Sequence, residues 1–212
     1  MTPNTYNVAL DVDGVLGDFE AHWLECAEET LGYSMRKVND RYDMGLRYGL
    51  SRKDVDAVWR AFHEDPLQGA TRWASVPLYP HATELVTALE DLGCTVWAVT
   101  SIDAEHRATR AESLAGLIPS GRIICVGHVS PSSAKANVLQ DMGAVAFLDD
   151  HPGNANAALG MVSLPVLLDR GYHGLEAPEY GVTVIDDPLD FPVLVEQLLE
   201  RTGRVALCKG AA

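Results

Sequence analysis

Residues 6–19 read Tyr-Asn-Val-Ala-Leu-Asp-Val-Asp-Gly-Val-Leu-Gly-Asp-Phe, and this stretch decides how the chain folds. The apolar run of residues 8–10 is typical of a buried strand, and Gly14 is a turn signal that ends it. Asp11 and Asp13 therefore fall at the end of a parallel strand, the edge where open α/β sheets bind ligands. Two carboxylates this close repel each other unless a cation compensates them. The alternative is an aspartate-rich turn with solvated side chains.

Two further apolar runs, residues 94–101 and 144–150, also end in polar side chains. Two hydroxyls close the first run and two carboxylates close the second: Thr100, Ser101, Asp149 and Asp150. Between the runs, Lys135 lies in a segment that is typical of a helix start. The hydroxyls could also cap the next helix, a role compatible with ligand binding, whereas the acids could instead sit at the N-terminus of another helix. The order of these features along the chain favours a functional site.

A strand with Asp-x-Asp, a strand with Thr/Ser, a Lys and a strand with Asp-Asp, in that order, resemble the four motifs of the haloacid dehalogenase-like phosphohydrolase superfamily. Within it, the chain is most similar to the 5′(3′)-deoxyribonucleotidase family. Residues 11–20, 76–85 and 147–152 carry this narrower resemblance, although the family often has Arg in place of His151. The resemblance is thin in residues 30–75, where substrate choice would be made.

The alternation of strands and helices predicts a parallel sheet covered on both faces, a Rossmann-like doubly wound α/β core. The expected strands are residues 6–12, 94–100, 121–127, 144–149, 164–168 and 181–185. The expected core helices are residues 80–92, 103–116, 132–142 and 188–202, with a short helix after residue 150. Residues 18–75 show helical spacing and no strand, which resembles the small helical cap of the superfamily. We therefore expect a cap domain at 18–75 and a core domain made of 1–17 and 76–212.

The resemblance implies a phosphatase that works through an aspartyl-phosphate intermediate. Asp11 would be the nucleophile, and Asp13 would protonate the leaving oxygen and then activate water. Three further residues would hold and neutralise the phosphate: Thr100, Ser101 and Lys135. Arg107 and Arg110 fall inside an expected helix and receive no role.

A hard divalent cation suits a site made only of oxygen ligands. The resemblance implies Mg²⁺ bound by the Asp11 carboxylate, the Asp13 backbone carbonyl and one acid of the last motif. By alignment that acid is Asp150, with Asp149 beside it, and the two could be swapped.

The resemblance also suggests aromatic contacts to a nucleobase. Phe19 matches, at its offset from Asp11, a family aromatic that packs on the base, and Trp59 and Tyr42 fall near two others. Trp59 also belongs to an apolar stripe at helical spacing, which favours a core position. Four histidines show no ligand spacing, and we expect them to be structural or exposed: His81, His106, His128 and His151.

The sequence thus predicts a cytosolic, Mg²⁺-dependent phosphatase that removes phosphate from a nucleoside monophosphate. One alternative is a phosphatase for another small phosphate ester, such as a sugar phosphate. The other is a binding protein that kept the fold and lost turnover.

Composition restricts the partners. The net charge of −14 argues against a nucleic-acid polymer or an anionic membrane surface. No apolar run approaches the roughly 20 residues that span a bilayer. The four cysteines lack paired or metal-ligand spacing, which favours a reducing cytoplasm. Homodimers are common in the resembled family.

Overall fold

A computed structural model describes residues 6–63 and 72–203 of the protein. Its centre is a six-stranded, fully parallel sheet in the order β3-β2-β1-β4-β5-β6. The strands are β1 Tyr6–Leu10, β2 Cys94–Thr100, β3 Ile123–Cys125, β4 Ala144–Asp149, β5 Leu164–Leu168 and β6 Thr183–Ile185. The strand order turns back at β1, and this reversal lies beside the predicted site.

Helices cover both faces of the sheet, which confirms the predicted doubly wound α/β fold. Helices α4 (Ala82–Asp91), α5 (Arg107–Ser113) and α8 (Asp190–Arg201) share a hydrophobic core with one face. Helix α6 (Ser133–Asp141) and the segment after α7 (Pro152–Ala157) pack on the other face. Successive residues of β1 enter different cores, since Val8 and Leu10 join the first and Ala9 joins the second.

Some expected boundaries differ from those observed. The strand predicted at 6–12 ends at Leu10, because the chain turns back and the amides of Leu16 and Gly17 both bond to the Val12 carbonyl. The expected helix 103–116 divides into a 3₁₀ turn, η2 (Ala104–His106), and α5. The strand expected at 121–127 is only β3, preceded by the 3₁₀ turn η3 (Ser120–Arg122).

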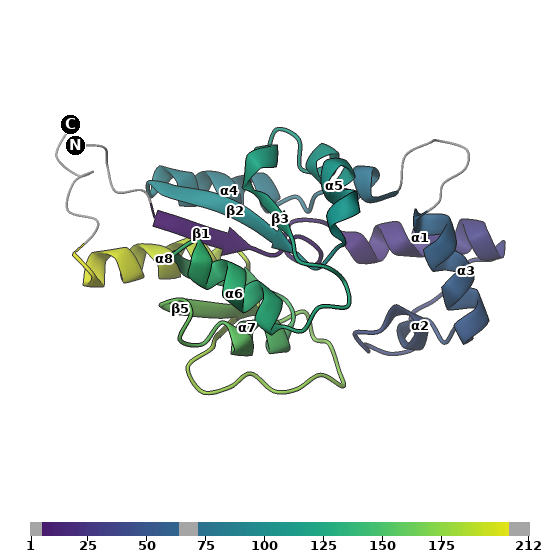
Figure 1. Ribbon diagram of the computed structural model, residues 1–212. Coiled ribbons are helices and arrows are strands. Elements are labelled where there is room, and N and C mark those ends of the chain that lie inside the picture. The colour runs from purple at the N-terminus through teal and green to yellow at the C-terminus, as the bar shows by residue number, and fades with distance from the viewer. Residues whose placement is uncertain (1–5, 64–71, 204–212) are drawn as a thin grey trace.

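Residues 19–63 form helices α1 (Phe19–Leu31), α2 (Met44–Arg47) and α3 (Arg52–His63). They lie together beyond the carboxyl ends of the strands, at one end of the molecule (Figure 1). With the 3₁₀ turn η1 (Arg72–Ser75), they surround a second hydrophobic cluster that includes Trp23, Phe62 and Trp73. We call these helices the cap; that they form a separate domain stays a prediction.

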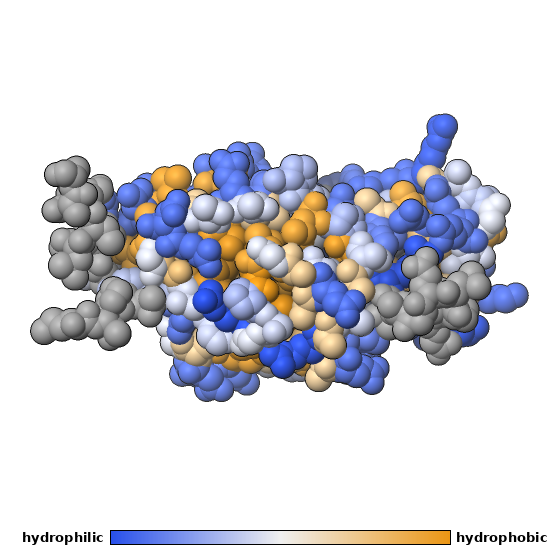
Figure 2. Space-filling view, turned by 90° about the horizontal axis from the view of Figure 1, so that it is seen from above, coloured by the Kyte–Doolittle hydropathy of each residue, from blue (hydrophilic) through white to orange (hydrophobic). Residues whose placement is uncertain are grey.

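The surface shows how apolar residues are distributed outside the cores. Seen from above, hydrophobic residues gather over the middle of the molecule, and hydrophilic residues cover much of its flanks (Figure 2). Among the described residues, no helix has the length and apolar character needed to cross a bilayer. The three described cysteines form no disulfide with one another; Cys208 lies outside the described residues.

Candidate active site

The loop after β1 carries Asp11 and Asp13 just past the strand. The Asp11 amide still donates to the Leu148 carbonyl of β4, at 2.8 Å, so this residue is fixed to the sheet. Gly14 then takes a φ of +83°, a left-handed conformation that favours glycine. A Cβ at Gly14 would lie 1.9 Å from Asp150 Oδ2. The glycine therefore allows the loop to pass directly against the second acidic motif.

Lys135 of α6 brings two of the acids together. Its ammonium lies 2.8 Å from Asp11 Oδ1 and 2.7 Å from Asp149 Oδ2. All three side chains are buried. Burial opposes the charged lysine, but the two carboxylates outweigh it and raise the pKa of Lys135. Lys135, which the order of motifs alone singled out, therefore places its ammonium between two acids.

The two acids of the last motif have different surroundings. Asp149 accepts hydrogen bonds from Lys135, from the His151 amide at 2.8 Å and from Asn154 Nδ2 at 3.1 Å, so both its oxygens are engaged. Asp150 instead lines the cavity. Burial, with the charges of Asp11 and Asp149, raises the pKa of Asp150 well above its usual value. This difference favours Asp150 as the direct metal ligand and Asp149 as the residue that orients Lys135.

The acids could hold a metal ion. Asp11, Asp149 and Asp150 each offer a carboxylate oxygen, and these atoms lie within 4.8 Å of one another. Lys135 contributes one positive charge against their three, and burial raises the pKa of Asp11 to about 7 despite the opposing effect of Lys135. An all-oxygen, under-compensated set fits a hard divalent cation such as Mg²⁺.

Asp13 has a partner that the sequence analysis missed. Arg110 of α5 donates from Nη2 to both Asp13 oxygens, at 2.8 and 2.7 Å. Arg110 is fully buried, whereas the Asp13 side chain is one-quarter exposed and lines the cavity. No sequence signal singled out Arg110, because it lies within a helix far from Asp13 along the chain.

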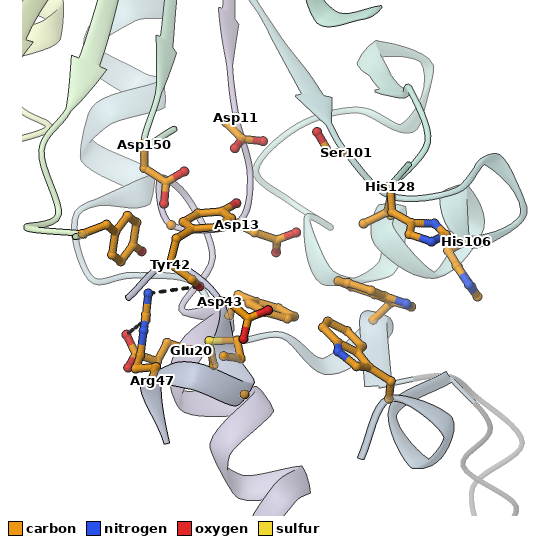
Figure 3. A pocket seen from close by; sticks show the side chains of 18 of the residues that line it. Asp11, Asp13, Glu20, Tyr42, Asp43, Arg47, Ser101, His106, His128 and Asp150 are labelled. Atoms are coloured by element: carbon orange, nitrogen blue, oxygen red, sulfur yellow. Dashed lines mark hydrogen bonds and ion pairs between the residues drawn. The ribbon is translucent and has the colours of Figure 1, made fainter. Parts of the chain in front are cut away.

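The two predicted hydroxyls take different positions. Ser101 lines the cavity, on the side of Asp11 away from Asp150 (Figure 3). Thr100 is fully buried and does not line it, and its Oγ1 has no hydrogen-bond partner among the described residues. Of the two, Ser101 is therefore the better placed to contact a ligand in this cavity.

A cavity of about 610 Å³ lies between the strand ends and the cap. On the cap side its wall is aromatic, and Phe19 stacks between Trp59 and Trp73 with ring centroids 5.9 and 5.6 Å away. Trp59 continues the stack to His63 at 5.7 Å, and His63 stacks on His106 of the core at 5.1 Å. Burial and, to a lesser extent, the charges of the nearby histidines lower the pKa of His63, which favours its neutral form. The predicted Phe19 and Trp59 thus line the cavity as parts of one stack.

Some of the histidines line the cavity and others support the fold, a difference that the sequence did not indicate. His106 and His128 line the cavity on the side of Ser101 (Figure 3). His128 Nδ1 lies 2.7 Å from Asp103 Oδ2, and its amide bonds to the same carboxylate. His81, by contrast, pairs with the Val15 carbonyl at 2.9 Å and serves the loop.

A cluster opposite the histidines joins the cap to the core. Tyr42, a predicted contact residue, lines the cavity with its ring centroid 5.3 Å from that of Tyr172. Arg47 lies over the Tyr172 ring at 4.7 Å and pairs with Glu20 (Figure 3). Beside them, the His173 amide donates to the Asp40 carbonyl at 2.7 Å. The segment around Tyr172 therefore holds the cap against the core.

Comparison with known proteins gives likeness at the level of structure. No protein-family model and no curated protein matches the sequence. A haloacid dehalogenase-like family hydrolase from Xanthomonas campestris is 18% identical, with a TM-score of 0.60 over 94% of this chain and 98% of the other. A HAD family hydrolase from Deinococcus radiodurans, with bound phosphate and sodium, is 15% identical, with a TM-score of 0.53 over 96% and 99%.

A third similar structure is the L-2-haloacid dehalogenase of Xanthobacter autotrophicus with chloropropionic acid covalently bound. It is 13% identical, with a TM-score of 0.56 over 90% of this chain and 98% of the other. These likenesses extend over nearly the whole length of each protein. The chain therefore has the fold of the haloacid dehalogenase-like hydrolases.

Proposed function

We propose that the protein is a Mg²⁺-dependent phosphatase that hydrolyses nucleoside monophosphates through an aspartyl-phosphate. The observation that carries this proposal is the arrangement around Asp11, whose Oδ1 is held by Lys135 and by the Val12 amide at 2.7 Å. No described residue donates a hydrogen bond to Asp11 Oδ2, so this oxygen is available for attack. Asp13 lies beside the same cavity.

The reaction divides into two balanced steps. Asp11 Oδ2 attacks phosphorus, the bond from phosphorus to the ester oxygen breaks, and the departing oxygen takes a proton from Asp13. Water then gives a proton to Asp13 and attacks the phosphorus, so that the bond to Asp11 breaks and inorganic phosphate leaves. Lys135 and the Ser101 hydroxyl would neutralise and hold the phosphate oxygens, because phosphoryl transfer depends chiefly on positioning and charge stabilisation.

Asp11 and Asp150 would hold Mg²⁺, with Asp149 behind them. Bound there, the ion would offset the repulsion between these acids and the phosphate. The structure from Deinococcus radiodurans, which carries phosphate and sodium, is consistent with a site for an anion and a cation in this fold.

The cavity wall supports a flat leaving group. Phe19, Trp59 and Trp73 present stacked aromatic rings on the cap side of the cavity. Aromatic side chains stack on nucleobases at about 1–3 kcal/mol per base, whereas a sugar leaving group would gain less from such a wall. This difference favours a nucleoside monophosphate over a sugar phosphate.

Charge supports a leaving group without a second anion. Of the described residues, six carboxylates line the cavity together with one Arg/Lys side chain, Arg47, which is already paired with Glu20. A phosphoglycolate, a sugar bisphosphate or a 2-haloacid would place its additional negative charge among these carboxylates. A halide leaving group also needs no proton, so dehalogenation would leave Asp13 without its role as the acid of the first step. A nucleoside is neutral and avoids both difficulties.

The test is phosphate release from a panel of esters, with Mg²⁺ and with EDTA. The panel contains nucleoside monophosphates, sugar phosphates and phosphoglycolate, and chloride release from 2-chloropropionate is measured in parallel. Asp11→Asn removes the nucleophile, and Asp91→Asn, on the exposed end of α4, is the matched control.

We expect EDTA-sensitive turnover of nucleoside monophosphates that Asp11→Asn abolishes and Asp91→Asn leaves unchanged. Turnover concentrated on sugar phosphates would refute the substrate class and keep the chemistry. Chloride release would replace the phosphatase assignment with a dehalogenase. No turnover of any ester, from protein that folds normally, would favour a binding role.

A further inference from the structure

The contact between Arg110 and Asp13 is incomplete for the arginine. A guanidinium usually meets a carboxylate with two parallel N–H donors. Here Nη2 alone contacts both Asp13 oxygens, and neither Nε nor Nη1 of Arg110 has a hydrogen-bond partner among the described residues. The Cζ atom of Arg110 lies over the Trp73 ring, 5.0 Å from its centre. Arg110 is thus fully buried with two of its donors unmet.

This arrangement is a poor device for stability. Buried donors without acceptors are costly, and a buried ion pair is weak evidence of net stabilisation. Arg107, on the same helix, shows the ordinary structural use of arginine here: it is exposed and donates to the carbonyls of Ile123 and Ser120, at 2.9 and 2.8 Å. The burial of Arg110 against Asp13 therefore calls for another explanation.

The other cation of the site does not reach Asp13. The ammonium of Lys135 lies at Asp11 and Asp149, on the opposite side of the strand ends from α5. Asp13 lies near Asp11, and like charges repel each other. Among the described Lys and Arg side chains, Arg110 alone forms an ion pair with Asp13. Arg110 holds both oxygens of the Asp13 carboxylate, and the Asp13 side chain, which is one-quarter exposed, still lines the cavity.

We propose that Arg110 is a positioning residue that holds the Asp13 carboxylate at the cavity wall as the base for the second half-reaction. This inference rests on the proposed function. In that half-reaction the aspartyl-phosphate on Asp11 is attacked by water, whose proton passes to Asp13 as the bond from phosphorus to Asp11 breaks. Arg110 acts through Asp13 and does not itself touch the substrate.

The experiment is stopped-flow hydrolysis of p-nitrophenyl phosphate with excess Mg²⁺. The p-nitrophenolate ion leaves readily without a proton, so the first half-reaction depends little on Asp13, whereas the second depends on it. The variants are Arg110→Gln, Arg110→Lys, Asp13→Asn and the double variant of Asp13→Asn with Arg110→Gln. Arg107→Gln is the matched control on the same helix. Circular dichroism and thermal melting report whether each variant folds.

We expect Arg110→Gln to release p-nitrophenolate in a burst equal to the enzyme concentration and then turn over about tenfold or more slowly than wild type. This loss is smaller than the roughly 10²–10⁴-fold that an acid–base group itself contributes. Arg110→Lys, which keeps the charge, should recover part of the rate. The double variant should be no slower than Asp13→Asn, and Arg107→Gln should behave as wild type.

Three results would overturn this inference and leave the proposed function standing. They are wild-type turnover in Arg110→Gln, slower turnover in Arg110→Gln without a burst of p-nitrophenolate, and a fold-loss in turnover from Arg110→Gln that is as large in the Asp13→Asn background as in wild type. If Arg110→Gln does not fold, Arg110→Lys is the test variant in its place. A folded Arg110→Lys protein with full turnover and no burst would show that the guanidinium is not needed and would overturn the inference. A wild-type protein that hydrolyses neither p-nitrophenyl phosphate nor any ester of the panel overturns the proposed function, and the inference with it.

Discussion

Replacing Lys135 by Met tests the buried charge arrangement directly. Lys135 is 1% exposed, and its ammonium lies 2.8 Å from Asp11 and 2.7 Å from Asp149, which are themselves buried. Methionine keeps most of the length and removes the charge, so two buried carboxylates lose their shared cation. Removing one partner of a buried ion pair costs about 3–5 kcal/mol. At about 2–4 °C per kcal/mol for a domain of this size, the melting temperature should fall by roughly 6–20 °C.

The assay is urea unfolding and thermal melting at neutral pH in EDTA, with Lys53→Met on the exposed face of α3 as control. The control should stay within about 0.5 kcal/mol of wild type. Excess Mg²⁺ should recover part of the Lys135→Met loss, because a cation that binds only the folded state stabilises it and compensates the same acids. A free energy of unfolding within about 1 kcal/mol of wild type in EDTA would refute the argument.

Three further predictions concern the acids. Asp150→Asn should abolish Mg²⁺ binding in calorimetry, whereas Asp149→Asn should chiefly lower the melting temperature; equal effects would contradict their different surroundings. Gly14→Ala should weaken Mg²⁺ binding, because its Cβ would lie 1.9 Å from Asp150 Oδ2, while Gly143→Ala, also at positive φ but with open space, should only destabilise. Burial raises the pKa of Asp11 to about 7, so the folded state retains a proton that the unfolded chain releases near pH 4. The urea midpoint of the metal-free protein should therefore fall as pH rises from about 4 to 7, and Asp11→Asn should flatten that fall.

The sequence predicted the central strands well because they are mostly apolar and largely buried. Strands β2, β4 and β5 have the expected bounds, and each has a neighbouring strand on both sides in the sheet. At the sheet edges the prediction was less accurate: β3 and β6 are only three residues long each. There, the expected ranges extend past the observed strands to residues such as Val126 and Val182, and no local pattern shows where each strand ends.

The site residues that the sequence identified are those with a fixed place in the motif order. Lys135 has no local signal, yet the order of motifs predicted its role, and it lies between two of the acids. Arg110 and Tyr172 could not be found in this way. Each reaches the cavity region through packing between segments far apart in sequence, and nothing in the neighbouring residues distinguishes them from ordinary surface positions.

The cap illustrates the same limit for specificity. Phe19 was expected to offer a face to the substrate, and it lines the cavity. Its stacking between Trp59 and Trp73, however, could not be foreseen, because both tryptophans lie in residues 30–75, where the resemblance to the family is thin. A base would therefore meet a wall built from three rings, to which Phe19 contributes as the central member.

The sum of the charges at the strand ends, with Asp13 and Arg110 included, also favours a divalent cation. Four carboxylates converge there, those of Asp11, Asp13, Asp149 and Asp150. Two buried cations, Lys135 and Arg110, are paired with three of them, which leaves two formal negative charges at the site. A monovalent ion would neutralise one of these charges, whereas a single Mg²⁺ neutralises both. Asp150 lines the cavity and has no cationic ion-pair partner in the described part of the chain. Burial and the neighbouring acids raise its pKa, so a divalent cation in the cavity would stabilise its charged form at the place where the phosphate would also bind.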